Sequence, residues 1–272
     1  MEIISTLKFQ KMKKSAEDLR EYMNSILGII SSVNAYVDLF AQAQAQADRE
    51  LVVLVSTEKW LCGSLNTLLF KKFDEAYAHK KDKLEVFALG KKAIEYCRHH
   101  HYQLVGHMHL EDEIASRDLK SLYTFLEQAL ASDRYASIQV WYNFFKNTMQ
   151  QLPTGFQLFP LSASSFRDFM ADLSIEIPQA QEWDLRVDMK LEPGRAKLLH
   201  SLQDMLMNIV IYGAVLHNKT WEHAARMLAM KWAKDNAITI VDDLTLSFNK
   251  ARQDAITQEV LEIVSAKAVL DD

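Results

Sequence analysis

Hydrophobic positions follow two different patterns along the 272-residue chain. Near both ends, apolar residues recur every three or four positions, from Leu19 to Phe40 near the N-terminus and from Leu199 to Val264 near the C-terminus. This spacing places them on one side of a helix. Each end of the chain is therefore predicted to form one long amphipathic helix.

The middle of the chain carries short continuous apolar runs instead. Residues 51–56 combine such a run with several valines, which is typical of a strand buried on both faces. By the same reasoning, strands are predicted at 51–56, 84–89, 102–105, 137–145 and 156–161, and helices at 66–79, 91–100 and 117–133. Strands that alternate with helices of this length predict a Rossmann-like α/β domain, with a mostly parallel sheet covered on both faces.

Helix length decides how the two ends are arranged. A continuous helix over residues 195–272 would be roughly 115 Å long, too long to bury its apolar stripe on one globule. It therefore needs a partner helix. We predict an antiparallel coiled-coil shaft of residues 1–48 and 195–272, standing on a central α/β domain of residues 49–194. Breakers are scarce, with 7 Gly and 4 Pro, and the shaft segments hold only Gly28 and Gly213.

Composition and charge exclude several classes of protein. The 49% of hydrophobic residues excludes a disordered chain, and Cys62 and Cys97 are too few for a disulfide scaffold. The longest apolar run, residues 205–216, is shorter than a membrane span, and the charged N-terminus is unlike a signal peptide. The net charge of -5 is spread along the chain and gives no sign of nucleic-acid binding. We expect a soluble, intracellular protein without direct membrane insertion.

The sequence lacks the common motifs of nucleotide binding and acyl transfer. Gly90-Lys91-Lys92 is the nearest approach to a phosphate loop, but no Ser or Thr follows the lysine. After the first predicted strand there is one glycine where a dinucleotide fingerprint has three, and no nucleophile elbow occurs. We therefore expect no cofactor and no catalytic residue.

One group of residues raises the possibility of a metal site. A cysteine and five histidines fall within thirteen positions: Cys97, His99, His100, His101, His107 and His109. Neighbouring histidines on a helix point about 100° apart and cannot all reach one ion. We favour a solvated helix end followed by a polar loop, without a metal. The alternative is an enzymatic α/β domain with a metal held by His107 and His109, which flank a strand.

Two further features are interpreted as structural. Cys62 follows a buried strand and is expected to be a packed thiol rather than a nucleophile. The acidic residues of the stretch 110–118 are Glu111, Asp112, Glu113 and Asp118. We interpret them as a solvated loop and a helix N-terminus, where the helix dipole favours negative charge.

Two segments give the sequence a specific resemblance. They are LVVLVSTEKWLCGSLNTLLFKKF at residues 51–73 and EHAARMLAMKWAKDNAITIVDDLTLSFNKARQDAITQEVLEIVSAKAVL at residues 222–270. Both resemble the gamma subunit of F-type ATP synthases, the rotor of that motor. That family has two long terminal helices in an antiparallel coiled coil around an α/β domain. The apolar pattern predicts the same architecture independently.

The resemblance implies a function as the central-stalk rotor subunit, which couples rotation driven by ion flow to ATP synthesis or hydrolysis. It implies a non-catalytic chain whose coiled coil lies inside a ring of alpha and beta subunits. The foot of the stalk would be held by the epsilon subunit and by the membrane ring of c subunits. The implied location is the cytoplasmic face of a bacterial inner membrane, as a peripheral part of the complex. No nucleic acid is implied as a partner.

The resemblance also implies which residues meet the beta subunits. Five residues fall within an arc of about 140° on a helix: Asn249, Arg252, Gln253, Ile256 and Thr257. Of these, Arg252, Gln253 and Thr257 match the residues that contact the beta-subunit catch loop, and an arginine fork suits an acidic loop. A second group is assigned to shaft packing and to the neighbourhood of the lower beta-subunit levers: Arg226, Met227 and Met230.

The chain departs from the family pattern at a few places. It starts inside the segment that resembles the N-terminal helix, so the upper shaft is expected to be a single C-terminal helix. Trp60 and Ser64 replace glycines of the first motif, and Trp221 replaces a serine. The short start leaves open an alternative, a divergent gamma-like stalk of a specialised, non-synthesising rotary ATPase. The neighbouring genes would separate the two.

Overall fold

A mixed five-stranded sheet forms the centre of the molecule. The computed structural model describes residues 2–32, 47–147, 150–162, 166, 169–170 and 194–270. The strands are β1 (Arg49–Val55), β2 (Leu84–Leu89), β3 (Gln103–Met108), β4 (Tyr135–Asn147) and β5 (Gln150–Phe159). Their order is β3-β2-β1-β4-β5, and only the β4–β5 pair is antiparallel. The predicted mostly parallel sheet is confirmed.

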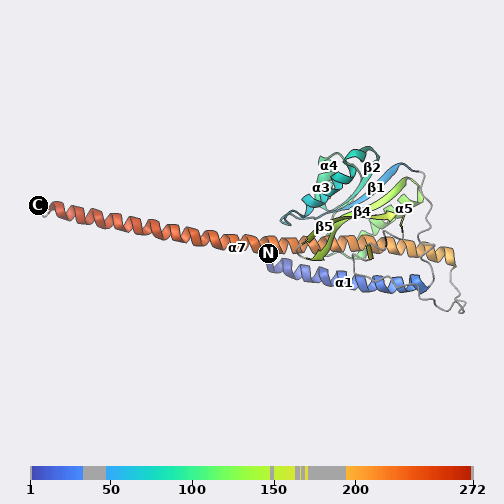
Figure 1. Cartoon of the computed structure of the whole chain (residues 1–272), viewed down its shortest axis with the longest axis horizontal. Coiled ribbons are helices and arrows are strands. Elements are labelled where there is room, and N and C mark those ends of the chain that lie inside the picture. Colours follow the sequence, from blue (N-terminus) through green and yellow to red (C-terminus); the bar gives the residue numbers. More distant parts are fainter. Residues whose placement is uncertain are drawn as a thin grey trace.

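Helices cover both faces of this sheet (Figure 1). They are α3 (Leu65–Tyr77), α4 (Lys91–His99) and α5 (Lys120–Ala131), with short 3₁₀ turns η1 (Ala78–Lys83) and η2 (Ser116–Leu119). Val52 and Leu54 of β1 pack with α3 and α4, whereas Leu51 and Val53 face α5 and the terminal helices. Because both faces of β1 are buried, its sequence is apolar at successive positions rather than at alternate ones.

Strand β5 begins earlier than the predicted 156–161. Its first half contains Pro153 and Gly155, which weaken a strand signal. Pro153 pairs with Asn143 of β4, and β5 is the last strand of the sheet. An edge strand tolerates proline because the missing N–H is not needed by a second neighbour.

The two terminal helices, α1 (Glu2–Ser32) and α7 (Arg195–Leu270), run side by side in opposite directions (Figure 1). A Cβ atom added to Gly213 of α7 would lie 3.3 Å from the Leu19 side chain of α1, so glycine allows a close approach here. The antiparallel pairing is as expected. The predicted continuation of the first helix to residue 48 falls partly on residues 33–46, which lie outside the described residues.

Helix α7 changes character along its length. Its lower part, residues 195–230, contributes buried apolar residues to the core, including Leu202, Leu206, Ile211 and Val215. From Lys231 to Ser265 every residue is exposed except the half-buried Asn249. We call residues 231–265 the projecting segment, which leaves the rest of the molecule as a single helix in Figure 1.

Candidate functional site

The projecting segment is a continuous helix without Gly or Pro. Its threonines satisfy their hydroxyl groups within the helix. Thr257 Oγ1 donates to the carbonyl of Gln253 at 2.8 Å, and Thr245 Oγ1 donates to the carbonyl of Val241 at 2.7 Å. A hydroxyl that donates its hydrogen within its own helix can still accept a hydrogen bond from an outside donor through its oxygen lone pairs.

The predicted beta-subunit contacts lie together on this segment. Arg252, Gln253, Ile256 and Thr257 are exposed, Ile256 at 52%, and Asn249 is half-buried. From Asn249 to Thr257 the helix rises only about 12 Å. The five side chains therefore form one compact surface, in which an arginine and two amides surround a branched apolar group.

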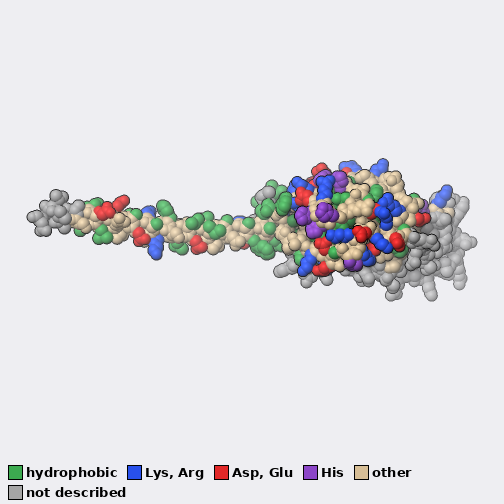
Figure 2. Space-filling model, turned by 90° about the horizontal axis from the view of Figure 1, so that it is seen from above, with side chains coloured by type: hydrophobic (Ala, Val, Ile, Leu, Met, Phe, Trp, Pro, Cys, Tyr) green, Lys and Arg blue, Asp and Glu red, His purple; other side chains and the backbone are tan. Residues whose placement is uncertain are grey.

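Apolar side chains are exposed on every side of the projecting segment. At about 100° per residue, Ile256, Leu246, Leu261 and Leu244 fall near about 40°, 120°, 180° and 280° from Arg252. Within the projecting segment, the large apolar residues exposed by more than half are Trp232, Ile238, Ile240, Val241, Leu244, Leu246, Phe248, Ile256, Val260, Leu261, Ile263 and Val264. Figure 2 shows hydrophobic side chains all along this helix, with charged groups between them. A helix that is apolar all round is normally enclosed.

The second predicted group lies where α7 leaves the rest of the molecule. Arg226 is buried, and its Nη2 donates to Oε1 of Glu222 at 2.7 Å. Met227 and Met230 are half-buried. The guanidinium of Arg226 is thus engaged within its own helix, whereas the two methionines present part of their surface outward.

The histidines of the candidate metal site are spread over different surroundings. The rings of His107 and His109 are 6.5 Å apart, and His109 Nδ1 lies 2.6 Å from a Glu58 carboxylate oxygen. His100 packs on Tyr96, and Cys97 is buried, which raises the pKa of its thiol to about 12. Within the described residues, no three His, Cys, Asp or Glu side chains are grouped so as to hold a metal ion.

The acidic loop has partners that the sequence did not indicate. Asp112 Oδ2 accepts hydrogen bonds at 2.7 Å from Lys8 of α1 and from Lys59 of the loop after β1. Partial burial alone would raise the pKa of Asp112, but the hydrogen bonds from Lys59 and Lys8 outweigh it and hold that pKa well below its usual range. Glu113 pairs with Lys11 of α1. The interpretation as a freely solvated loop is therefore wrong for Asp112, since the loop fastens α1 to the domain.

The remaining sequence features occupy the loop between β1 and α3. Cys62 is buried beside Thr57, and this burial raises the pKa of its thiol. Trp60 is exposed, and the Lys92 ammonium lies 3.2 Å from the centre of its ring. Leu61 adopts a φ of 65°, a conformation that favours glycine. The turn thus keeps a left-handed residue although glycine is absent at that position.

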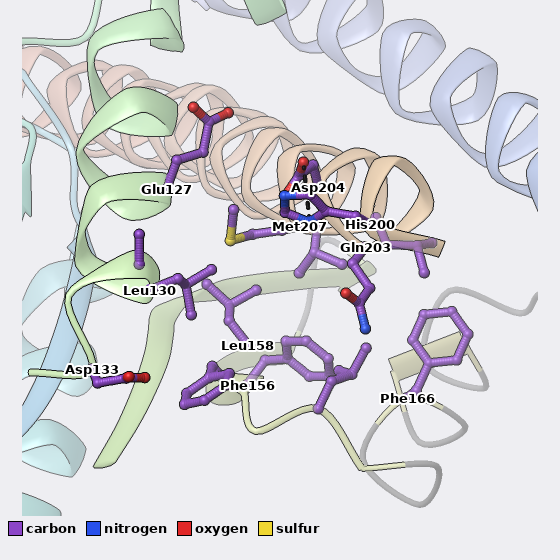
Figure 3. Close-up of a pocket in the computed structure, with 15 residues that line it drawn as sticks. Glu127, Leu130, Asp133, Phe156, Leu158, Phe166, His200, Gln203, Asp204 and Met207 are labelled. Atoms are coloured by element: carbon purple, nitrogen blue, oxygen red, sulfur yellow. Dashed lines mark ion pairs between the residues drawn. The ribbon is translucent and has the colours of Figure 1, made fainter. Parts of the chain in front are cut away.

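A pocket of about 820 Å³ lies between α5, β5 and the lower part of α7 (Figure 3). Phe156, Leu158 and Met207 line it, and His200 forms an ion pair with Asp204 at 3.7 Å on its α7 side. Its lining is predominantly apolar. The pocket shares no residue with the predicted contact surface on the projecting segment.

None of the helices that the structure describes combines the length and the hydrophobicity that a membrane span requires.

Comparisons with known proteins agree on one family. A family model described as ATP synthase matches residues 1–270. The ATP synthase gamma chain of Opitutus terrae is 31% identical over 273 residues, which cover 98% of this chain and 90% of the relative. The ATP synthase gamma chain of Xanthomonas campestris pv. campestris strain B100 is 32% identical over 278 residues, with 99% and 92% covered.

Solved structures support the fold. The central stalk and c-ring structure of Tetrahymena thermophila mitochondrial ATP synthase contains a chain that matches with a TM-score of 0.62 at 18% identity, covering 86% of this chain and 97% of that one. A chain of the Euglena gracilis mitochondrial ATP synthase matches with a TM-score of 0.59 at 17% identity, covering 99% and 94%.

Paired terminal helices around a mostly parallel sheet, together with these relatives, define a central-stalk subunit of an F-type ATP synthase. The chain belongs to the ATP synthase gamma chain family.

Proposed function

We propose that the projecting segment turns inside a ring of alpha and beta subunits, and that its rotation sets the state of their ATP sites. The supporting observation is the distribution of exposed apolar groups around the whole circumference of this helix. A single partner helix would cover one side only. A ring covers all sides, and it satisfies the apolar surface at every rotor angle.

Rotation can be coupled to chemistry because the segment is chemically asymmetric. Arg252 lies on one side, while Asp254 and Leu261 lie near the opposite side, at about 200° and 180° from it. Identical subunits arranged around the helix therefore meet different surfaces. A rotor angle then favours one state at one beta subunit and another state at the next, since a contact shifts an equilibrium only when it differs between states.

Within this scheme, Arg252, Gln253, Thr257, Asn249 and Ile256 contact the beta subunits. The Arg252 guanidinium can hold an acidic loop by two parallel hydrogen bonds, while Gln253 and Asn249 offer amides beside it. At the root of the segment, Met227 and Met230 are assigned to the lower beta-subunit levers. Arg226 is assigned to packing because Glu222 already engages it.

We also propose that the chain catalyses nothing alone and acts as a peripheral part of the complex at the cytoplasmic face of a bacterial membrane. Its foot would contact the epsilon subunit and the c-subunit ring. Purification from the native source tests this membership. Alpha, beta, epsilon and c subunits should co-purify with the chain, in a fixed ratio and with ATPase activity. Isolation as a stable monomer would contradict the proposal.

A matched pair of double variants tests the contact surface in the assembled enzyme. Arg252→Ala with Gln253→Ala removes a charged and an amide contact, and should lower coupled ATPase activity by about tenfold or more, because a hydrogen bond to a charged group contributes about 1.5–3 kcal/mol. The control, Lys250→Ala with Gln258→Ala, removes a cationic and an amide side chain from other sides of the helix and should have a much smaller effect. Equal losses in both would contradict the assignment.

A further inference from the structure

A buried polar stretch of α7 precedes the projecting segment. Seven polar or charged residues here are exposed by 8% or less: His217, Asn218, Lys219, Thr220, Glu222, His223 and Arg226. Burying a charged group is costly unless partners compensate it. The contacts of these side chains therefore show which parts of the molecule this stretch of α7 connects.

The charged residues form a buried triad. Glu222 pairs with Lys219 Nζ at 3.3 Å through one carboxylate oxygen and with Arg226 Nη2 at 2.7 Å through the other. Lys219 also donates to the carbonyl oxygen of Leu110, 3.4 Å away, in the loop after β3. Burial lowers the pKa of His223 to about 4, so its ring adds no further positive charge at neutral pH. Through Lys219, the triad is therefore hydrogen-bonded to a part of the domain outside α7.

Two more hydrogen bonds fasten the same turns of α7 to the sheet. Trp221 Nε1 donates to the carbonyl oxygen of Phe144 at 2.8 Å, and Asn143 Nδ2 donates to Asn218 Oδ1 at 3.1 Å. Both partners belong to β4. Since Lys219 reaches the loop after β3 while Trp221 and Asn218 reach β4, α7 is held at two separate elements of the domain.

These polar contacts lie at the base of the projecting segment, where they can oppose its rotation relative to the domain. Arg226 precedes the projecting segment by only a few residues, so any twist of that segment passes through these turns. The hydrophobic effect that drives apolar contacts is non-directional. Hydrogen bonds to fixed backbone carbonyls are directional, and lose their geometry when the helix rotates.

We propose that Lys219, Trp221 and Glu222 form a polar joint that locks the rotational position of α7 on the α/β domain. The joint makes the domain and the projecting segment turn as one body. This inference rests on the proposed rotary function, and it identifies positioning residues for coupling outside the beta-subunit contact surface.

Variants in the assembled enzyme test the joint. Lys219→Met keeps an unbranched side chain but removes the donor to Leu110, and Trp221→Phe keeps an aromatic ring but removes the donor to Phe144. The double variant should lower the number of ions pumped per ATP hydrolysed, because a helix that rotates on its domain transmits only part of each turn. A probe fixed to α4 should show a wider angular spread when the ring is immobilised.

Ile211→Val is the control because it weakens only apolar packing of the same helix. It should leave both the pumping ratio and the angular spread unchanged. If the double variant fails to assemble, Trp221→Phe alone is measured in the same way. An unchanged ratio and spread in assembled variants would overturn the joint, as would equal changes in the control. Failure of wild-type enzyme to couple hydrolysis to pumping would instead contradict the proposed function.

Discussion

The lower part of α7 and the projecting segment both carry large apolar residues, which are buried in the former and exposed in the latter. In the lower part Ile211 is fully buried and Leu206 is 3% exposed, whereas in the projecting segment Ile263 is 70% and Leu244 is 63% exposed. The lower part packs against α1 and the sheet of its own chain. The projecting segment also carries many large apolar residues, and they stay exposed in the part of the chain that the structure describes. Under the proposed function, one helix therefore has two kinds of partner, its own chain below and other subunits above.

Removing a charged side chain should give the largest difference in unfolding free energy between the two parts, because the charge is buried only in the lower part. Glu222→Ala removes the carboxylate shared by Lys219 and Arg226, and should lower the free energy of unfolding of the isolated chain by about 3–5 kcal/mol. Glu262→Ala, the matched change in the projecting segment, should alter it by less than about 0.5 kcal/mol. Denaturant titration measures both. Similar losses would mean that the triad is not a special feature of the lower part.

Truncating an isoleucine to alanine should give almost as large a difference in unfolding free energy between the two parts. Ile211→Ala opens a cavity in the core and should cost about 2–5 kcal/mol of unfolding free energy. Ile263→Ala removes the same atoms from an exposed position and should change the isolated chain by less than about 0.5 kcal/mol. Thermal or denaturant unfolding of the purified chain checks the pair. A cost above 1 kcal/mol for Ile263→Ala, a threshold of about twice the normal surface effect, would show that the upper part is packed.

Acid should weaken the lower part through its buried histidines. Burial lowers the pKa of His217 and of His223 from 6.5 to about 4. Between these two pKa values the unfolded chain binds protons that the folded chain does not. The free energy of unfolding is therefore unaffected by the two histidines above pH 6.5, and it decreases as the pH falls from 6.5 towards 4. Each histidine contributes a slope of up to about 1.4 kcal/mol per pH unit.

His217→Gln should flatten this slope between pH 6.5 and 4, because it removes one of the two groups. The control is His99→Gln, the same substitution at an exposed histidine of α4. Denaturant midpoints measured across this pH range give the comparison. An unaltered slope in His217→Gln would mean that this imidazole takes up its proton in the folded chain.

The smallest effect is expected at the link between α1 and the domain. Asp112→Asn weakens the pairs with Lys8 and Lys59, both partly exposed, and should cost about 1 kcal/mol. Glu113→Gln changes a pair that is exposed on both sides and should leave the unfolding free energy unchanged within error. Equal effects of the two substitutions would show that Asp112 has no special role in holding α1.

Much of the fold was predictable because its periodicities are strong. Residues 51–55 lie in a strand buried on both faces, and the three- and four-residue spacing at both ends predicts the paired helices. The start of β5 was not predictable, since Pro153 is tolerated only at a sheet edge, and edge position is a tertiary property.

The sequence likewise predicted one of the two functional surfaces and missed the other. The exposure of Arg252 and its neighbours follows from a helix longer than its partner. Their contacts with beta subunits stay predictions. The polar joint was missed because its charged members, Lys219 and Glu222, resemble a solvent-exposed stretch of a helix in sequence. Only tertiary packing shows that they are buried, and Asp112 finds Lys8 from 104 positions away.

Enclosure of the projecting segment on all sides is tested most directly by cysteine labelling. Ile256→Cys, Leu261→Cys and Leu244→Cys place a thiol on three sides of the helix, near about 40°, 180° and 280° from Arg252. The native Cys62 and Cys97 are buried and should give a slow background. All three introduced thiols should react readily with a maleimide in the isolated chain and slowly in the assembled enzyme. Protection of only one side, or of none, would contradict a segment that turns inside a ring.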